Sequence, residues 1–177
     1  MDVHLNVRPV RPEDELFLRE LRAQVDAERL GLQQWSPESL PLAGKLLDQQ
    51  FRAHAAHYKT VKNNWDTKDC VIEFNGHLAG RFILTQDVKI VHLSDIAVHL
   101  AFRGLGIGQA VIQGVMGECE QSRRLLRLHV DPQNPAVQLY QRLGFRQLEE
   151  RAGVWLLEWT PLALQGRSMF FDPNSAR

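Results

Sequence analysis

The 177-residue chain lacks features that would place it in several broad classes of protein. It has no excess of one charge, because 21 Lys and Arg residues balance 21 Asp and Glu residues. A general binder of nucleic acid or of anionic membranes would carry a basic excess. The chain also has no apolar run as long as a membrane span and no signal-peptide core at its N-terminus. We therefore expect a cytoplasmic protein that binds neither nucleic acid nor membrane.

Cysteine is scarce too, since Cys70 and Cys119 are the only two. Cys119 lies on the apolar face of an expected helix and Cys70 opens an expected strand, which favours two small core residues over a disulfide. The length suits one domain, which we expect to cover residues 1–160. Large apolar residues in the tail, residues 161–177, favour docking on the body or, as the weaker option, on a second subunit in a homodimer. These residues are Leu162, Leu164, Met169, Phe170 and Phe171.

Apolar periodicity and turn residues predict an alternating order of strands and helices. His54 and His57 lie three residues apart on the second expected helix, at about 40–58, and this spacing can hold a metal. No third ligand is nearby, so we expect no metal site. The Asn75-Gly76 pair is a strong hairpin signal. Strands are expected at about 3–10, 70–74, 77–85, 88–98, 125–130, 145–149 and 154–159, and helices at about 16–30, 40–58, 107–123 and 135–143.

A glycine-rich loop lies between the strand ending at Val98 and a helix with an apolar residue at every fourth position. Its sequence is Arg103-Gly104-Leu105-Gly106-Ile107-Gly108. The glycines allow backbone conformations closed to other residues and let a ligand come close. The helix start adds free N–H groups and the positive end of a dipole, and Arg103 adds a charge suited to phosphate oxygens. The loop therefore predicts an anion site, most naturally for phosphate.

The spacing of the glycines separates several interpretations of this loop. A dinucleotide-binding loop would need its third glycine at Gln109, and a P-loop would end in Gly-Lys-Ser/Thr. The pattern that fits, R-x-x-G-x-G, resembles the acyl-CoA pyrophosphate loop of the GNAT superfamily of N-acetyltransferases, the alternative being a glycine-rich turn without a ligand. Asn134-x-Ala136-x-x-Leu139-Tyr140-x-x-x-Gly144-Phe145 resembles a later helix of that superfamily and the turn after it. The resemblance covers residues 3–159.

The resemblance implies an α/β (α+β) fold, with a twisted mixed sheet of about six to seven strands flanked by about four helices. Strands 90–98 and 125–130 would run parallel and splay apart, with acetyl-CoA in the gap. The pantetheine arm would pair with the backbone of the strand segment Ile96-Ala97-Val98 like an added strand. The pyrophosphate would lie on the N–H groups of residues 103–108, and Asn134 would reach the pantetheine directly or through a water.

The resemblance also assigns Tyr140 as the general acid that protonates the departing CoA thiolate. A phenol of pKa about 10 can supply a proton to a thiolate whose acid has a pKa of about 8.5. Tyr140 also shares one helical face with Ala136, Leu139 and Leu143, so the alternative is a core tyrosine.

Several groups compete for the role of general base. His92 lies on the cofactor strand, where some GNAT members carry a histidine or glutamate, and an imidazole titrating at about 6.5 suits the role. Asp95 is its rival: on a regular strand His92 and Ser94 face one side and Asp95 the other, although a bulge would change that. His129 on the neighbouring strand and a relay of ordered water are the remaining alternatives.

The function that these features favour is acetyl-CoA-dependent N-acetyl transfer to a primary amine, by direct attack and without a metal. A CoA-binding sensor or scaffold, and an acyltransferase that uses another acyl-CoA or an oxygen acceptor, are the alternatives. The acceptor should be selected by the first two helices and their loop, with Trp35 and Tyr58 as candidate wall residues. The sequence does not distinguish a peptide, an antibiotic, a polyamine or a small metabolite as the acceptor.

Overall fold

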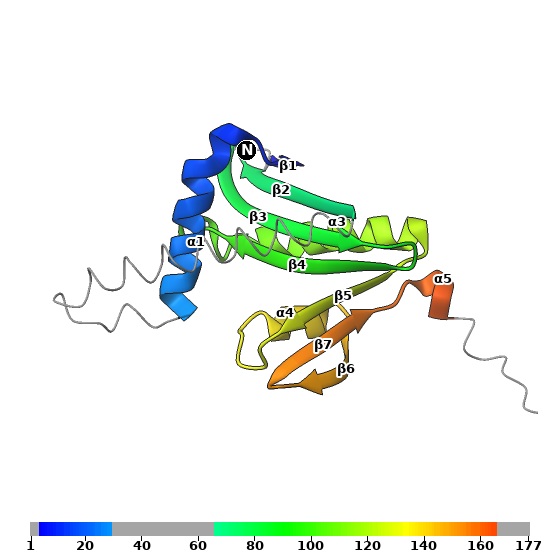
Figure 1. The fold of residues 1–177 in the computed structure, drawn as a ribbon. Coiled ribbons are helices and arrows are strands. Elements are labelled where there is room, and N and C mark those ends of the chain that lie inside the picture. Colours follow the sequence, from blue (N-terminus) through cyan, green and yellow to red (C-terminus); the bar gives the residue numbers. More distant parts are fainter. Residues whose placement is uncertain (1–3, 30–65, 166–177) are drawn as a thin grey trace, which may run out of the picture. The chain divides into compact units, whose positions relative to one another are not determined.

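The computed structural model describes residues 4–29 and 66–165. These residues form a seven-stranded mixed sheet in the order β1-β2-β3-β4-β5-β7-β6, with four α-helices (Figure 1). The expected fold class is therefore confirmed. The strands are β1 Leu5–Pro9, β2 Asp66–Phe74, β3 His77–Gln86, β4 Ile90–Val98, β5 Leu125–Val130, β6 Arg146–Arg151 and β7 Val154–Trp159. The helices are α1 Glu15–Arg29, α3 Ile107–Ser122, α4 Val137–Arg142 and α5 Leu162–Gln165, with 3-10 turns at Pro12–Asp14 and Leu100–Phe102.

The chain divides into two compact units. Unit 1 comprises Met1–Thr85 and Asp95–Gly108, and unit 2 comprises Gln86–Ser94 and Gln109–Arg177. The division cuts through β4 and through the start of α3. The expectation of a single domain over residues 1–160 stays a prediction.

In unit 1, ion pairs fix the path of the chain from β1 into α1. Arg8 on β1 donates two hydrogen bonds to Asp14, at 2.8 and 2.9 Å, and a third to Glu73 on β2 at 2.7 Å. Hydrogen bonds from Arg8 and from the N–H of Arg11 hold the pKa of the buried Asp14 carboxyl at about 2, although burial opposes the shift. The bidentate pair therefore keeps the start of the helical segment against the strands.

The hairpin between β2 and β3 turns at Asn75-Gly76, as expected. Both residues have positive φ, 50° and 82°, which is the backbone of the tight turn that Asn-Gly favours. β2 begins at Asp66 rather than Cys70, because its polar start is also paired. Asp69 accepts two hydrogen bonds from Arg81 on β3, both at 2.9 Å, and its carbonyl accepts the N–H of Val10 at 3.0 Å.

In unit 2, the apolar face of α3 is buried, as its four-residue repeat predicted. Val111, Val115 and Cys119 are each at most 5% exposed, and both cysteines are free. Glu120, on the same helix, accepts the N–H groups of Leu162 and Ala163 at 3.0 and 3.2 Å. This contact attaches the first residues of the tail to α3.

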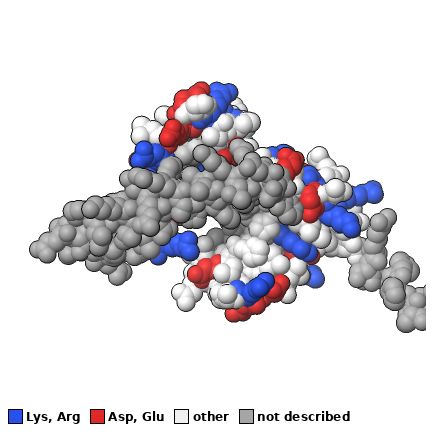
Figure 2. All heavy atoms as spheres, viewed as in Figure 1, with Lys and Arg blue, Asp and Glu red and all other residues white. Residues whose placement is uncertain are grey.

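Some expectations fall outside the described residues. These are the helix at 40–58, His54, His57, Trp35 and Tyr58, and the tail residues Met169, Phe170 and Phe171. Among the helices that the structure describes, none is long and apolar enough to cross a membrane. On the face shown in Figure 2, acidic and basic atoms are interspersed, in keeping with the zero net charge.

Candidate functional site

The glycine loop of unit 1 has the conformation that an anion site requires. Gly104 and Gly106 both have φ of +76°, a left-handed backbone that favours glycine. A Cβ at either position would meet nothing within 4 Å, so the space above the loop is open. Gly108 lies in the first turn of α3, whose N–H groups have no acceptor within the helix. The loop therefore exposes backbone donors at the positive end of a helix.

Arg103 connects this loop to the end of β4 and to α1. Its Nε donates to the carbonyl of Val98 at 2.9 Å, and its Nη1 contacts both carboxylate oxygens of Glu28 at 3.0 Å. Nη2 has no partner among the residues that the structure describes. Glu28 therefore compensates part of the Arg103 charge that the sequence predicts to bind phosphate, and Nη2 is the guanidinium nitrogen that stays available to a ligand.

The end of β4 is shaped by a glycine on the neighbouring strand. A side chain on Gly80 would collide with the carbonyl oxygen of Ala97, so glycine alone permits this close approach. The N–H of His99, directly after β4, donates to the carbonyl of Ala79 at 2.8 Å. Ile96, Ala97 and Val98 are half-buried. Gly80 thus fixes the backbone that the sequence predicts to bind the pantetheine arm.

Asp95 of β4, one candidate base, takes part in an ion-pair network with residues of α1. Its carboxylate lies 3.9 Å from Nη1 of Arg22, and Arg22 also makes two hydrogen bonds, at 2.9 and 2.7 Å, to the buried Asp26. Arg22 is thus shared between two carboxylates. This arrangement suits a structural role for Asp95 as well as it suits proton transfer.

The parallel ladder between β4 and β5 is short. It covers four rungs, from Ile90↔Leu125 to Leu93↔Leu128, and does not include the last residues of β4. β5 continues to Val130 in antiparallel pairing with β7. The splay of these two strands that the family resemblance implies stays a prediction.

At the end of this ladder, His92 of β4 and His129 of β5 are in direct contact. His92 Nε2 lies 3.0 Å from His129 Nδ1, and the ring centroids are 5.0 Å apart. His92 is half-buried and His129 is exposed. Burial first, then the nearby His129 and Arg127, lowers the pKa of His92 from 6.5 to about 4. At neutral pH the His92 ring is therefore uncharged.

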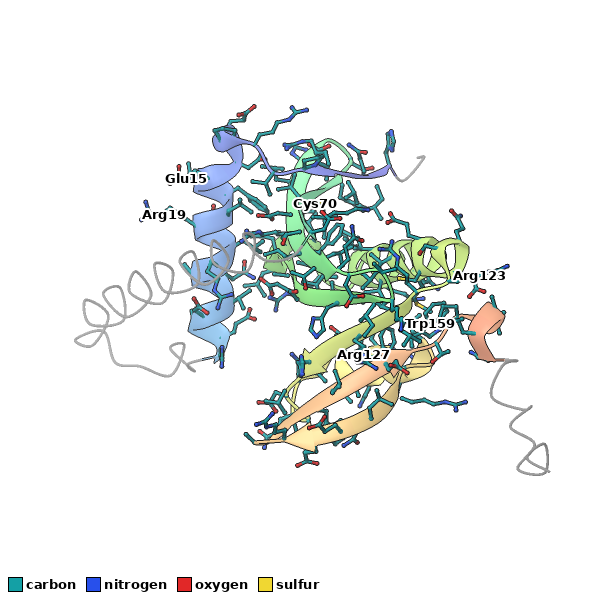
Figure 3. The ribbon with its side chains drawn as sticks, turned by 45° about the vertical axis from the view of Figure 1, so that its right-hand side comes forward. Glu15, Arg19, Cys70, Arg123, Arg127 and Trp159 are labelled. Carbon is teal, nitrogen blue, oxygen red and sulfur yellow. The ribbon has the colours of Figure 1, made fainter. Side chains whose placement is uncertain are left out.

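Arg127 of β5, labelled in Figure 3, is opposite His92 of β4 in one ladder and opposite Glu158 of β7 in the other. Its Nε donates to Glu158 of β7 at 2.8 Å, and the hydroxyl of Thr160 donates to the same carboxylate at 3.4 Å. The guanidinium thus faces a carboxylate while its charge still disfavours protonation of His92.

Tyr140 and Asn134 lie in the second family-like motif. The Tyr140 ring is 6% exposed and makes an edge-to-face contact with Phe145, with centroids 5.7 Å apart. α4 begins at Val137, later than expected, because Asn134 Oδ1 accepts the N–H of Ala136 at 2.9 Å and forms a turn before the helix. A hydrogen bond from this amide to pantetheine would therefore come from Nδ2.

Sequence reasoning missed the contacts that join distant parts of the chain. Arg103 and Glu28 are 75 residues apart, and His92 and His129 are 37 residues apart. No local pattern reveals such pairs. Gly80 did carry a signal, because glycine inside a strand marks a close backbone approach.

Comparisons with known proteins agree with these observations. A protein-family model described as "Acetyltransferase (GNAT) domain" matches residues 32–165. Among solved structures, PaiA N-acetyltransferase from Thermoplasma acidophilum, in complex with coenzyme A, has a TM-score of 0.63 and 16% identity over 89% of this chain and 99% of its own. The ribosomal-protein-S18-alanine N-acetyltransferase from Escherichia coli has a TM-score of 0.59 and 16% identity, over 89% and 94% of the two chains.

A third structure, Arabidopsis thaliana Naa50 in complex with the bisubstrate analogue CoA-Ac-MVNAL, has a TM-score of 0.57 and 15% identity, over 88% and 98% of the chains. No curated protein matches the sequence. At these identities the solved structures establish the fold, and the family match covers most of the sequence. The chain belongs to the GNAT superfamily of N-acetyltransferases.

Proposed function

We propose that this protein transfers the acetyl group of acetyl-CoA directly to a primary amine, with both substrates bound at once. The observation that carries the proposal is the glycine loop at the start of α3, with two left-handed glycines and open space above them. Backbone N–H groups there suit the CoA pyrophosphate, and Nη2 of Arg103 adds a charged donor. Acetyl-CoA is a substrate in this scheme, and the reaction uses no metal.

The residues of β4 hold the donor in position for attack. The pantetheine arm pairs with the backbone of Ile96, Ala97 and Val98, and Asn134 donates to it from Nδ2, directly or through a water. A backbone N–H near Val98 polarises the thioester carbonyl, so that charge developing on its oxygen is stabilised. Much of the acceleration comes from holding the amine and the thioester together.

Proton transfers complete the reaction. The amine nitrogen attacks the carbonyl carbon, the C–S bond breaks, and the hydroxyl of Tyr140 gives its proton to the departing thiolate. The proton lost by the amine goes to His92, with Asp95, His129 and ordered water as the other candidate acceptors. Tyr140 is then reprotonated from solvent, which balances the protons over the cycle.

The acceptor amine belongs to one of four candidate classes, which are peptides, antibiotics, polyamines and small metabolites. The structures of the Escherichia coli enzyme and of Naa50 carry names that refer to an alanine of a ribosomal protein and to CoA-Ac-MVNAL, so peptide N-termini are the first class to test. We place the protein in the cytoplasm, on the sequence features given above, with a homodimer as a possible assembly.

A coupled assay of free thiol release tests this proposal. Purified protein is incubated with acetyl-CoA and each amine class, and CoA binding is measured separately by calorimetry. Amine-dependent thiol release with a mass increase of one acetyl group on the amine supports transfer. CoA binding without turnover on any amine would favour a sensor or scaffold. Faster release from a longer acyl-CoA would make the protein a different acyltransferase.

A further inference from the structure

The two histidines at the end of the β4–β5 ladder make a contact that only certain protonation states allow. His92 Nε2 and His129 Nδ1 are 3.0 Å apart, which is a hydrogen-bond distance between nitrogens. One nitrogen must carry the proton and the other must present its lone pair, so at least one ring is neutral. The pair is therefore a formed hydrogen bond that links a half-buried ring to an exposed one.

The surroundings of the pair set the direction in which a proton moves. Arg127 is opposite His92 in the ladder, and Glu158, opposite Arg127 on β7, binds that guanidinium. Arg146 of β6 is opposite Glu158 in the next ladder. The positive charge of Arg127 thus lies near the half-buried ring of His92, whereas the ring of His129 is open to water.

These features make His92 a poor place for a proton to remain. Burial and the neighbouring positive groups keep its ring neutral at the pH of a cell. A ring of this kind can still accept a proton on one nitrogen while it releases another from the opposite nitrogen. His129, held at hydrogen-bond distance and exposed, is placed to receive the released proton.

We propose that His92 and His129 form a two-ring proton relay that carries the proton of the attacking amine to solvent. This inference rests on the proposed acetyl transfer. As the new N–C bond forms, the amine proton moves to Nδ1 of His92, and the proton on His92 Nε2 moves to Nδ1 of His129. His129 then carries the positive charge and releases its Nε2 proton to water, and exchange with water restores the starting tautomers. His129 acts through His92 and does not touch the substrate.

A glutamine at position 129 separates the relay from a purely structural contact. His129→Gln keeps an oxygen that accepts the His92 N–H, but an amide does not take up the proton. We expect kcat/KM to fall about 10²-fold, the lower end of the range for proton transfer, with KM for acetyl-CoA unchanged. Added imidazole should restore part of the rate in His129→Ala. His77→Gln, at an exposed histidine elsewhere on the sheet, is the matched control and should keep the wild-type rate.

The opposite results would overturn the relay. Full activity in His129→Gln would mean that His129 only orients the His92 ring. A loss of activity that imidazole does not restore in His129→Ala would also contradict proton transfer through the exposed ring.

A measurement without substrate distinguishes failure of the relay from failure of the proposed function. NMR of the ring nitrogens should show a proton on Nε2 of His92 and a lone pair on its Nδ1, and the His92 ring should stay neutral until the pH falls to about 4. If no amine is acetylated but these tautomers are found, the proposed function fails while the relay geometry stands. If the His92 ring is already protonated near pH 6.5, or if its Nε2 carries no proton, the relay is wrong whatever the activity.

Discussion

The glycine loop and the histidine pair are built in opposite ways, although both belong to the proposed machinery. The loop is made of backbone within six consecutive residues, and its conformation depends on glycines with φ of +76°. The histidine pair is made of two side chains on different strands, brought to 3.0 Å by the register of a four-rung ladder. The loop can therefore be found from local sequence, whereas the pair exists only once the sheet has formed.

The two regions also treat charge differently. Arg103, the first residue of the loop, has a permanent charge that Glu28 partly compensates at 3.0 Å. His92 has a charge that burial suppresses, with a pKa of about 4. A permanent charge suits the binding of an anion that never changes its protonation, and a suppressed charge suits a group that passes a proton on. The predictions below test this contrast, from the largest expected effect to the smallest.

The largest effect is expected from Gly106→Val in the loop. A valine there is strained by the positive φ and also places a branched side chain in the open space proposed for the phosphate oxygens. We expect CoA affinity to fall by at least about 10²-fold, or about 2.7 kcal/mol. Calorimetry with CoA measures the loss.

The control for Gly106→Val is Gly76→Val in the β2–β3 turn. Gly76 has a φ of +82° and, like Gly106, open space around its Cβ position. Both variants should lose similar stability, roughly 1–2 kcal/mol from the left-handed backbone. Only the loop variant should lose CoA binding. Equal CoA affinity in the two variants would show that the loop does not bind the pyrophosphate.

Tyr140→Phe tests whether unit 2 contributes chemistry or only packing. The phenylalanine keeps the edge-to-face contact with Phe145 at 5.7 Å and removes only the hydroxyl. We expect kcat to fall about 10²-fold with little change in Tm. Tyr140→Leu removes the ring as well and should lower both kcat and Tm. If Tyr140→Phe keeps the wild-type kcat, the tyrosine is a core residue.

The pH dependence of stability tests the suppressed charge of His92. Its pKa is about 4 in the folded protein and 6.5 without the fold, so the unfolded state binds more protons between these values. Stability should therefore decrease as pH falls from about 6.5 to 4, by roughly 1–3 kcal/mol. Asp14, with a pKa lowered from 3.8 to about 2, loses its contribution only below this window.

Urea unfolding at several pH values, with His92→Gln as the comparison, measures this dependence. The variant should show a flatter profile between pH 6.5 and 4. The same low pKa means that protonation of His92 should not lower kcat/KM as the pH falls through 6.5. An imidazole with an ordinary pKa would lower it there. A profile of stability that is identical in wild type and His92→Gln would mean that the ring is not held neutral by the fold.

The sequence predicted the order of strands and helices because each element carries its own local signal. The Asn75-Gly76 turn, the four-residue repeat on α3, and Gly144, whose φ is +90° after α4, all needed only neighbouring residues. The early start of β2 was missed because its first residues are polar. They are held by partners such as Arg81 that lie in another strand.

The candidate site was predictable to the same extent and for the same reason. The glycine loop follows from spacing alone, and the positions of His92 and His129 on neighbouring strands were foreseen. Their contact was not, because it depends on a register in which His92 lies opposite Arg127 and His129 lies two residues further along β5. The compensation of Arg103 by Glu28 depends on the path of α1, which no local pattern specifies.

The smallest effect is expected from removing the charge of Glu28, which compensates Arg103 of the glycine loop. If the glycine loop binds CoA as proposed, Glu28 and the phosphates of CoA compete for the guanidinium of Arg103, so Glu28→Gln should strengthen CoA binding. An exposed ion pair is worth about 0.2–1 kcal/mol, which corresponds to an affinity gain of up to about fivefold. The gain should shrink as salt is raised, because salt screens the added attraction.

Glu13→Gln makes the same change of charge in the exposed turn before α1 and provides the control. If both variants gain affinity equally, the effect comes from net charge and not from Arg103. If Glu28→Gln weakens binding instead, Glu28 holds the guanidinium in its binding orientation, and the ion pair prepares the loop for the anion. Calorimetric titration with CoA at two salt concentrations separates these outcomes, since competition predicts tighter binding at low salt and orientation predicts weaker binding at both.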